Sequence, residues 1–392
     1  MEQTIKLYDA DAYRTKFGAK VLSCKEVIVN DEKRYEVILD QTLFFPEEGG
    51  QSADQGTIQN SKVLDVQIKN DIITHTLERN LPVESIVEGE IDWKHRFYNM
   101  QQHSGEHIFS GLVHSQFGYD NAGFHLSNQV VTMDFSGILS DTDVRKIEQQ
   151  VNECIVKNLP IEVTFPSKEE LKKMEYRSKI EIDGQVRIVT VPGYDVCACC
   201  APHVKRTGEI GMLKVVNTQN YKGGIRIFIL CGFRALDDYR EKLDNVLFIS
   251  KMLSAKPELV AEATQKIKND LGTVKQELVA AKQELMMQKI TQIPKQEVNV
   301  CLFEKAADAG VMRTAVNVLV QNHTGFCGIF VGTDETGYRY IVGIDEGDAR
   351  EMGNLLKKEF QAKGGGSAEM IQGSLQGTAE KIKEIFERKI YE

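Results

Sequence analysis

Two histidines one helical turn apart are the first sign of chemistry in this 392-residue chain. His103 and His107 stand at positions i and i+4 in a segment whose apolar spacing predicts a helix over residues 94–115. On a helix this spacing points both imidazoles to one side, as two ligands of one metal ion require. Ordinary core or surface histidines show the same spacing, so the pair alone is a weak signal.

A cysteine-rich segment, Cys197-Ala-Cys-Cys-Ala-Pro-His203, supplies a second half-site. Together the two halves offer nitrogen and sulfur ligands, a mixture that suits zinc. The residues alone leave open whether Cys197, Cys199 or Cys200 is the ligand. They also leave open a redox or structural cysteine cluster without metal.

Composition sets limits on the class of protein. Five of the eight cysteines are scattered singly, and the other three lie within four residues. We therefore expect no disulfide framework, and we expect the protein to work in a reducing compartment. The net charge of −9 argues against a broad, nonspecific nucleic-acid binder. Without a signal peptide or a run of about 20 apolar residues, the sequence predicts a cytoplasmic protein with no membrane partner.

Hydrophobic periodicity predicts an α+β protein of four parts. Residues 1–90 are rich in short β-branched runs separated by Asn-Asp and glycine turns, which favours a small β-barrel or sandwich. Residues 91–235 alternate helix and strand around the two segments that hold the candidate ligands, and residues 236–294 form a polar helical arm. Residues 295–392 predict a separate C-terminal α/β domain.

Apolar residues in the arm follow a heptad pattern over three repeats. The pattern admits two interpretations, a helical hairpin within one chain or a coiled coil between two copies. A homodimer through the arm or the C-terminal domain is therefore one expectation. The seam consists of Thr264, Ile267, Leu271, Val274, Leu278, Ala281 and Leu285.

Four segments, in order along nearly the whole chain, resemble the freestanding alanyl-tRNA editing proteins, the AlaX group. That group is similar to the editing half of alanyl-tRNA synthetase, and the last segment resembles its tail domain, called DHHA1. The segments are Phe45-Pro-Glu-Glu-Gly-Gly-Gln51, His103-Ser-Gly-Glu-His107, Cys199-Cys-Ala-Pro-His203 and Gly364-Gly-Gly-Ser-Ala-Glu-Met370.

The resemblance implies one Zn²⁺ per chain, held by His103, His107, Cys199 and His203, because the family's cysteine lies four residues before the histidine. Glu48 replaces a glycine of the family's first motif. No synthetase adenylation domain is expected, so the resemblance implies editing in trans. The implied reaction is hydrolysis of mischarged Ser-tRNA(Ala), or also Gly-tRNA(Ala), which makes mischarged tRNA(Ala) the expected partner. The alternatives are a zinc-stabilised tRNA-binding protein without catalysis and a deacylase for another mischarged tRNA.

Three residues are candidates for catalysis. Glu106 directly precedes the second histidine, unlike the glutamate of His-Glu-x-x-His peptidases, and is a candidate base or a surface helix residue. The resemblance places His125 and Thr132 beside the pocket. The Thr132 hydroxyl could bond the hydroxyl of serine, or Thr132 could be an ordinary strand residue.

Two glycine segments are candidates for substrate binding. Gly49, Gly50 and Gln51 would let backbone approach the tRNA end, with a tight turn as the alternative; Ser127 is expected to line the same pocket. The run Gly364, Gly365 and Gly366 would contact RNA through its backbone, with Lys363 near a phosphate. Its alternative is a flexible hinge.

Overall fold

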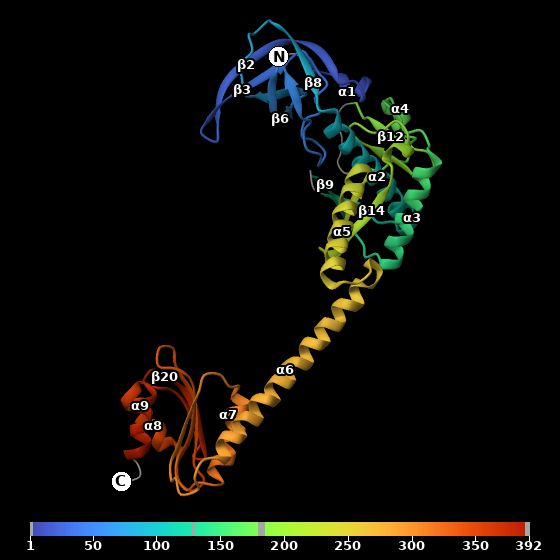
Figure 1. Cartoon of the computed structure of the whole chain (residues 1–392). Coiled ribbons are helices and arrows are strands. Elements are labelled where there is room, and N and C mark those ends of the chain that lie inside the picture. The colour runs from blue at the N-terminus through green and yellow to red at the C-terminus, as the bar shows by residue number, and fades with distance from the viewer. Residues whose placement is uncertain (1–2, 128–129, 179–184, 389–392) are drawn as a thin grey trace. The chain divides into compact units, whose positions relative to one another are not determined.

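The computed structural model describes residues 3–127, 130–178 and 185–388, and it divides into two compact units, Met1–Asn245 and Val246–Glu392 (Figure 1). Helices and strands are mixed in both units, which confirms the predicted α+β class. The finer division at residues 90, 235 and 294 stays a prediction. Within the described ranges, no helix combines the length and the apolar content needed to cross a bilayer.

The N-terminal segment forms a closed barrel of six antiparallel strands. Its hairpins turn through two-residue loops with positive φ at both positions, such as Asn30-Asp31 and Asn70-Asp71, because these loops match the twist of the paired strands. Inward side chains, Val21 and Val37 among them, are fully buried. Around the barrel the strands are β2 (Lys16–Val29), β3 (Glu32–Leu39), β7 (Ile72–Leu77), β6 (Ser61–Lys69), β5 (Gly56–Ile58) and β8 (Ile86–Ile91). The short elements β1 (Ile5–Lys6), α1 (Leu7–Ala10) and β4 (Gln41–Thr42) complete this part.

Helix α2 (Trp93–Phe117) carries both ligand histidines and covers one face of a four-stranded antiparallel sheet. Alternate residues of the sheet, such as Val131 and Met133, share one core with Ile108 of α2. The sheet order is β14 (Leu213–Tyr221), β15 (Gly224–Cys231), β10 (Val131–Phe135) and β9 (Asn121–Leu126). Helix α3 (Asp141–Lys157) begins with a capping box between Ser140 and Asp143.

A buried ion pair joins the barrel to α2. The fully buried guanidinium of Arg96 donates to Asp54 and, at 2.6 Å, to the Leu43 carbonyl. Asp54 also accepts the backbone N–H of Phe45 at 2.7 Å. Because losing one partner of a buried pair costs roughly 3–5 kcal/mol, this cluster fixes the start of α2 against the segment that contains Gly49 to Gln51.

A small antiparallel sheet positions the cysteines. Its order is β11 (Glu162–Thr164), β12 (Ile188–Val191) and β13 (Asp195–Ala198), and Cys199 follows its last strand directly. The short helices α4 (Lys168–Leu171) and η1 (Thr207–Ile210) flank this region in sequence.

The arm is helical as predicted, with α5 (Gly232–Leu253), the 3-10 turn η2 (Pro257–Leu259) and α6 (Val260–Thr291). The C-terminal sheet has five strands, and the predicted glycine segment is its edge strand. Its order is β16 (Val300–Glu304), β17 (Cys327–Thr333), β18 (Gly337–Gly343), β20 (Met370–Leu375) and β19 (Lys363–Gly366). The helices are α7 (Ala309–Val320), α8 (Ala349–Phe360) and α9 (Ala379–Arg388). Two apolar clusters lie in this unit, one with α8 and α9 and one with α7 and the end of α6.

Candidate metal centre

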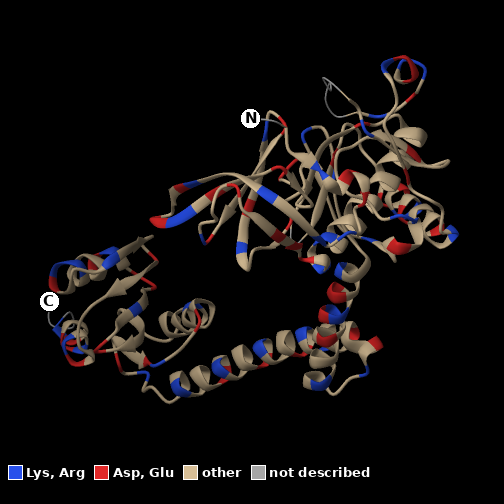
Figure 2. Ribbon diagram, turned by 90° about the horizontal axis from the view of Figure 1, so that it is seen from above, with Lys and Arg blue, Asp and Glu red and all other residues tan. Residues whose placement is uncertain are grey.

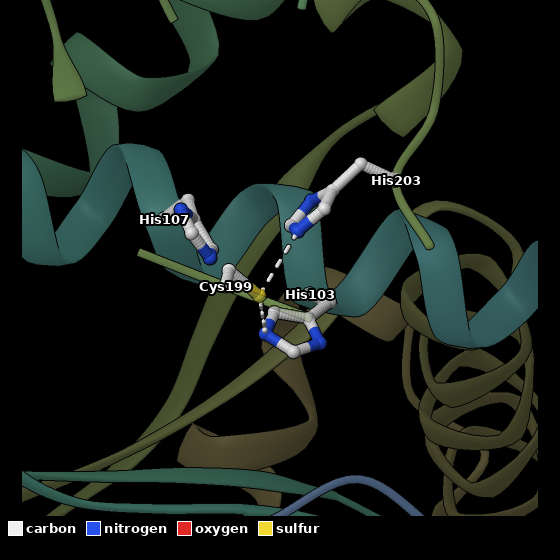
Figure 3. Close-up of side chains that lie close together, drawn as sticks. All are labelled: His103, His107, Cys199 and His203. Atoms are coloured by element: carbon white, nitrogen blue, oxygen red, sulfur yellow. Dashed lines mark hydrogen bonds between the residues drawn. The ribbon is translucent and has the colours of Figure 1, made fainter. Parts of the chain in front are cut away.

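Four side chains, from helix α2 and from the loop after β13, converge in the first unit. His103 and His107 point to one side of α2, Cys199 follows β13, and His203 lies in the loop after it (Figure 3). Each offers one ligand atom, and all four atoms lie within 4.8 Å of one another. The three imidazoles are almost fully buried. The structure thus brings together the four residues predicted as ligands.

The separations between these atoms fit a tetrahedral metal. The Cys199 sulfur lies 3.5 Å from Nε2 of His103 and 3.4 Å from Nε2 of His203 (Figure 3). With metal–ligand bonds of about 2.0–2.3 Å, two ligands of a tetrahedral zinc ion stand roughly 3.3–3.8 Å apart. A set of three buried imidazoles and one partly exposed thiol therefore fits zinc in both donor type and spacing.

Each ligand imidazole is held at its other nitrogen. Nδ1 of His103 donates to the side-chain oxygen of Gln51 at 2.8 Å, and Nδ1 of His107 lies 3.0 Å from the Asp195 carboxylate. Nδ1 of His203 lies 3.0 Å from the Ser104 hydroxyl. An Nδ1–H bonded outward leaves Nε2 as the free donor for metal. The Gln51 oxygen and the Asp195 carboxylate only accept, so they preset the tautomers of His103 and His107 that a metal needs.

Protonation separates Cys199 from its neighbours. Burial alone would raise the pKa of its thiol, but the adjacent His103 and His203, with hydrogen bonds from two imidazoles, hold that pKa well below its usual range. Burial raises the pKa of Cys197 and of Cys200. Of these three cysteines, Cys199 is therefore the best suited to act as a thiolate ligand.

Cys197 takes part in a second, overlapping group with His107 and Asp195. In that group the Asp195 carboxylate is bound by Arg177, whose Nε and Nη2 donate to it at 2.7 and 2.9 Å. Because the carboxylate already accepts from His107 and Arg177, it serves here as an orienting group.

The segment Glu48 to Gln51 is a tight turn. Gly49 and Gly50 have φ of 62° and 83°, and the backbones of Glu48 and Gln51 pair across them. A Cβ on Gly50 would lie 2.3 Å from the carbonyl oxygen of Phe124. The segment thus forms the tight turn that the sequence allowed as the alternative. The turn places the fully buried side chain of Gln51 against His103.

Several predicted substrate residues border one hollow of about 460 Å³. Gly49 and Gly50 form one side, and His125 and Ser127 form the other. Gln51 does not line this hollow, since its side chain is buried behind the turn. A contact between Gly49, Gly50, His125 or Ser127 and the tRNA end stays a prediction, and the hollow shows that these four residues share a surface.

The two other candidates for catalysis lie elsewhere. Glu106 is buried rather than on the surface, and its Oε1 accepts from Ser110 at 2.7 Å and from Asn121 at 2.6 Å. Thr132 stands opposite His125 in the strand register, whereas its neighbours in β10 face the core under α2. Thr132 therefore lies on the opposite face of the sheet from that core, the face that it shares with His125.

The C-terminal glycines form a strand, not a hinge. Gly364 and Gly366 pair with β20, and a Cβ at either position would lie 2.2 Å from a backbone carbonyl of that strand. They belong to the second unit.

Known proteins match this chain over its whole length. Residues 186–228, which include Cys199 and His203, match the family "Threonyl and Alanyl tRNA synthetase second additional domain", and residues 5–95, the barrel region, match "tRNA synthetases class II (A)". "Alanyl-tRNA editing protein AlaX-L" of Pyrococcus horikoshii is 26% identical over 98% of both chains. "Alanyl-tRNA editing protein Aarsd1" of Mus musculus is 26% identical over 96% of this chain and 94% of its own.

The chain is similar to alanyl-tRNA editing proteins over almost its whole length.

The chain's relatives include much longer proteins. The "Alanine--tRNA ligase" of Ignicoccus hospitalis is 30% identical over 72% of this chain, but the match covers 32% of that ligase. This chain thus corresponds to about a third of such a ligase, whereas it spans almost all of the two editing proteins.

Sequence reasoning missed three residues of this candidate site. Two of them, Asp195 and Ser104, hydrogen-bond the imidazoles of His107 and His203, and the third, Arg177, holds Asp195. Nothing in the sequence distinguishes these three from other polar residues. The pairing of Gln51 with His103 spans 52 positions, and that of His107 with Asp195 spans 88. Such contacts depend on the tertiary fold. One sign of these orienting contacts was present in the sequence, namely the position of Gln51 at the end of the first motif.

Proposed function

We propose that this protein is a zinc-dependent aminoacyl-tRNA deacylase that hydrolyses mischarged Ser-tRNA(Ala), and also Gly-tRNA(Ala), in trans. The observation that carries the proposal is the cluster of three buried imidazoles and the low-pKa thiol of Cys199 in a chain that aligns end to end with alanyl-tRNA editing proteins. A zinc ion bound there would supply a Lewis acid for the ester carbonyl.

The chain's own residues would prepare the site. Gln51, Asp195 and Ser104 hold the imidazoles in position, and Arg177 holds Asp195 in turn. The hollow beside Gly49 and Gly50 would receive the aminoacylated end of the tRNA, with His125 and Ser127 at its border.

The second unit offers a surface for the tRNA backbone. A hollow of about 800 Å³ is lined by four cationic side chains and one aspartate, Asp308, in a chain whose net charge is −9. We propose that this basic hollow and the adjacent strand of Gly364, Gly365 and Gly366 contact tRNA phosphates. The four cations are Lys282, Lys305, Arg339 and Lys363.

A second candidate function rests on the number of ligands. Four protein ligands complete a tetrahedron, which is the pattern of structural zinc sites, whereas catalytic sites usually keep one position open. A zinc-stabilised tRNA-binding protein without catalysis would show the same four residues.

One experiment separates these functions. Purified protein is incubated with Ser-tRNA(Ala), Gly-tRNA(Ala), correctly charged Ala-tRNA(Ala) and one mischarged tRNA of another identity, and ester hydrolysis is followed. The proposal expects the first two to be cleaved and Ala-tRNA(Ala) to be spared. His103→Ala should abolish cleavage. If every charged tRNA is bound but decays as in buffer, the binding function stands instead.

A further inference from the structure

Lysines and arginines lie along both units (Figure 2), but among the described residues only two of them are buried, Arg96 and Arg187. Arg96 pairs with Asp54 and joins the barrel to α2. Taking a guanidinium out of water is costly unless its charge and its N–H groups find partners. The partners of Arg187 therefore indicate what this second buried cation does.

Arg187 contacts the loop that contains two of the candidate ligands. Its Nη1 donates to the backbone carbonyl of Cys199 and to that of Ala201, at 2.8 Å each. These two hydrogen bonds are called the Arg187 bridge below. The backbone carbonyl of Arg187 also accepts the N–H of Cys199 at 3.0 Å. Arg187 thus holds the backbone of Cys199 at both its N–H and its carbonyl.

The loop needs this support because it is not a helix. His103 and His107 share a side of α2 through helix geometry alone. Cys199 and His203 have the same spacing of four residues, but they lie in irregular backbone after β13. Their ligand atoms are nevertheless 3.4 Å apart. Buried carbonyls outside helices and strands need other donors, and Arg187 supplies the donor for two of them.

The far end of the loop is held from α2. The Ser104 hydroxyl lies 3.0 Å from Nδ1 of His203 and accepts the N–H of Val204 at 3.2 Å. Between the two ends, Ala201 is fully buried in the apolar core of the barrel. The path from Cys199 to His203 is therefore set at its end by Ser104, at its middle by packing and at its start by Arg187.

An aspartate from the N-terminal segment pairs with Arg187. Oδ1 of Asp9, in α1, lies 3.4 Å from Nε of Arg187, and the two side chains are 26% and 9% exposed. A carboxylate at this distance offsets the cost of burying the guanidinium. It also leaves Nη1 directed at the loop, since Nε and Nη1 belong to one rigid planar group.

We propose that Arg187 is a positioning residue of the metal centre. The Arg187 bridge sets the backbone between Cys199 and Ala201, so that the Cys199 sulfur and the His203 imidazole reach one ion, and Asp9 acts through Arg187. Arg187 itself is not a ligand. This inference rests on the zinc centre of the proposed function, but it does not depend on deacylation.

The test measures zinc affinity of the full-length chain by competition with a chelator. Residues that orient metal ligands typically change metal affinity by about 10–100-fold, and Arg187→Gln should lower zinc affinity by such a factor. The matched control is Arg226→Gln. It removes the same charge and also breaks hydrogen bonds to an aspartate, Asp134, within the large sheet. Arg226→Gln should bind zinc like wild type.

Cobalt distinguishes positioning from a general loss of stability. The visible absorption bands of a thiolate-bound Co²⁺ depend on the geometry of its ligands. At saturating Co²⁺, Arg187→Gln should shift these bands and Arg226→Gln should not. A loss of stability alone would lower the melting temperature but leave the bands of the folded protein unchanged.

Asp9→Ala covers the case in which Arg187→Gln does not fold. It changes a partly exposed side chain and keeps the Arg187 bridge donors. It should lower zinc affinity by about two- to tenfold, the effect of one hydrogen bond. In the Arg187→Gln background the same change should have no further effect, because Asp9 acts through Arg187.

Three outcomes decide the matter. Wild-type zinc affinity and unshifted cobalt bands in Arg187→Gln overturn the positioning role, as does wild-type zinc affinity in Asp9→Ala if Arg187→Gln is unfolded. A wild type that binds no zinc overturns the zinc centre and the positioning role with it. A wild type that binds zinc but cleaves no aminoacyl-tRNA overturns deacylation alone, and the role of Arg187 then stands or falls on the zinc affinities.

Discussion

The side-chain oxygen of Gln51 accepts a hydrogen bond from Nδ1 of His103 at 2.8 Å, which ties the glycine turn of the barrel to the ligand helix. Gln51→Leu removes the acceptor and keeps a similar volume. Partners of this kind typically change metal affinity by about 10–100-fold. We expect such a loss of zinc affinity in a chelator competition.

The control for this variant is Gln55→Leu, since Gln55 lies in the same segment with an exposed side chain. It should bind zinc like wild type. Equal zinc affinity in Gln51→Leu and wild type would show that the Gln51 contact does not position His103.

Gly49 and Gly50 both have positive φ, yet they should respond differently to substitution. Asn tolerates positive φ, so Gly49→Asn places its Cβ at an ordinary 3.6 Å from the Cys200 sulfur and should be mild. The Cβ of Gly50→Asn would lie 2.3 Å from the Phe124 carbonyl oxygen, which forces the turn to move. Gly50→Asn should therefore lower both melting temperature and zinc content. If the two variants behave alike, the close approach at Gly50 has no consequence.

His75 should make the barrel sensitive to acid. Its fully buried ring has Nε2 2.9 Å from the Thr42 hydroxyl, and burial lowers its pKa to about 4. The unfolded chain takes up a proton near pH 6.5, whereas the folded chain does so only near 4. The free energy of unfolding should thus be highest above about pH 7 and should fall by up to about 3 kcal/mol as the pH is lowered to 4.

Denaturant unfolding followed by fluorescence of Trp93, the single tryptophan, measures this dependence. His75→Phe keeps the edge contact with Phe44 but cannot titrate. The difference between the two pH profiles isolates the histidine. Parallel profiles between pH 4 and 7 would contradict the assignment.

Glu106 and Thr132 were candidates for catalysis, and their positions lead us to expect small effects. Because the Glu106 carboxylate anchors Ser110 and Asn121, Glu106→Gln should keep deacylation within about tenfold of wild type, whereas loss of a general base costs roughly 10²–10⁴-fold. Thr132→Val should leave the preference for serine over alanine unchanged. A hundredfold loss in Glu106→Gln at full zinc content would establish it as the base.

Local patterns predicted the elements better than they predicted the contacts between them. The spacing of His103 and His107 predicts a shared side of a helix, and that follows from helix geometry alone. Chemistry alone could not select the cysteine from the sequence, because the low pKa of Cys199 depends in part on His103, which is 96 positions away in the sequence but adjacent in the fold.

The glycine segments illustrate the limit differently. Sequence reasoning assigned both to substrate contact, since glycine permits close approach. In the structure the close approach is to the chain itself, to Phe124 at Gly50 and to strand β20 at Gly364. A sequence shows that a position needs a small residue, but it does not show which neighbour imposes the need.

The central claim is that the Cys199 site holds the zinc that deacylation requires. Zinc per chain and single-turnover hydrolysis of Ser-tRNA(Ala) should be measured on the same preparations of wild type, Cys199→Ala and Cys200→Ala. We predict about one zinc and full activity in wild type and Cys200→Ala, with both lost in Cys199→Ala. Hydrolysis at the wild-type rate by zinc-free Cys199→Ala would contradict the account.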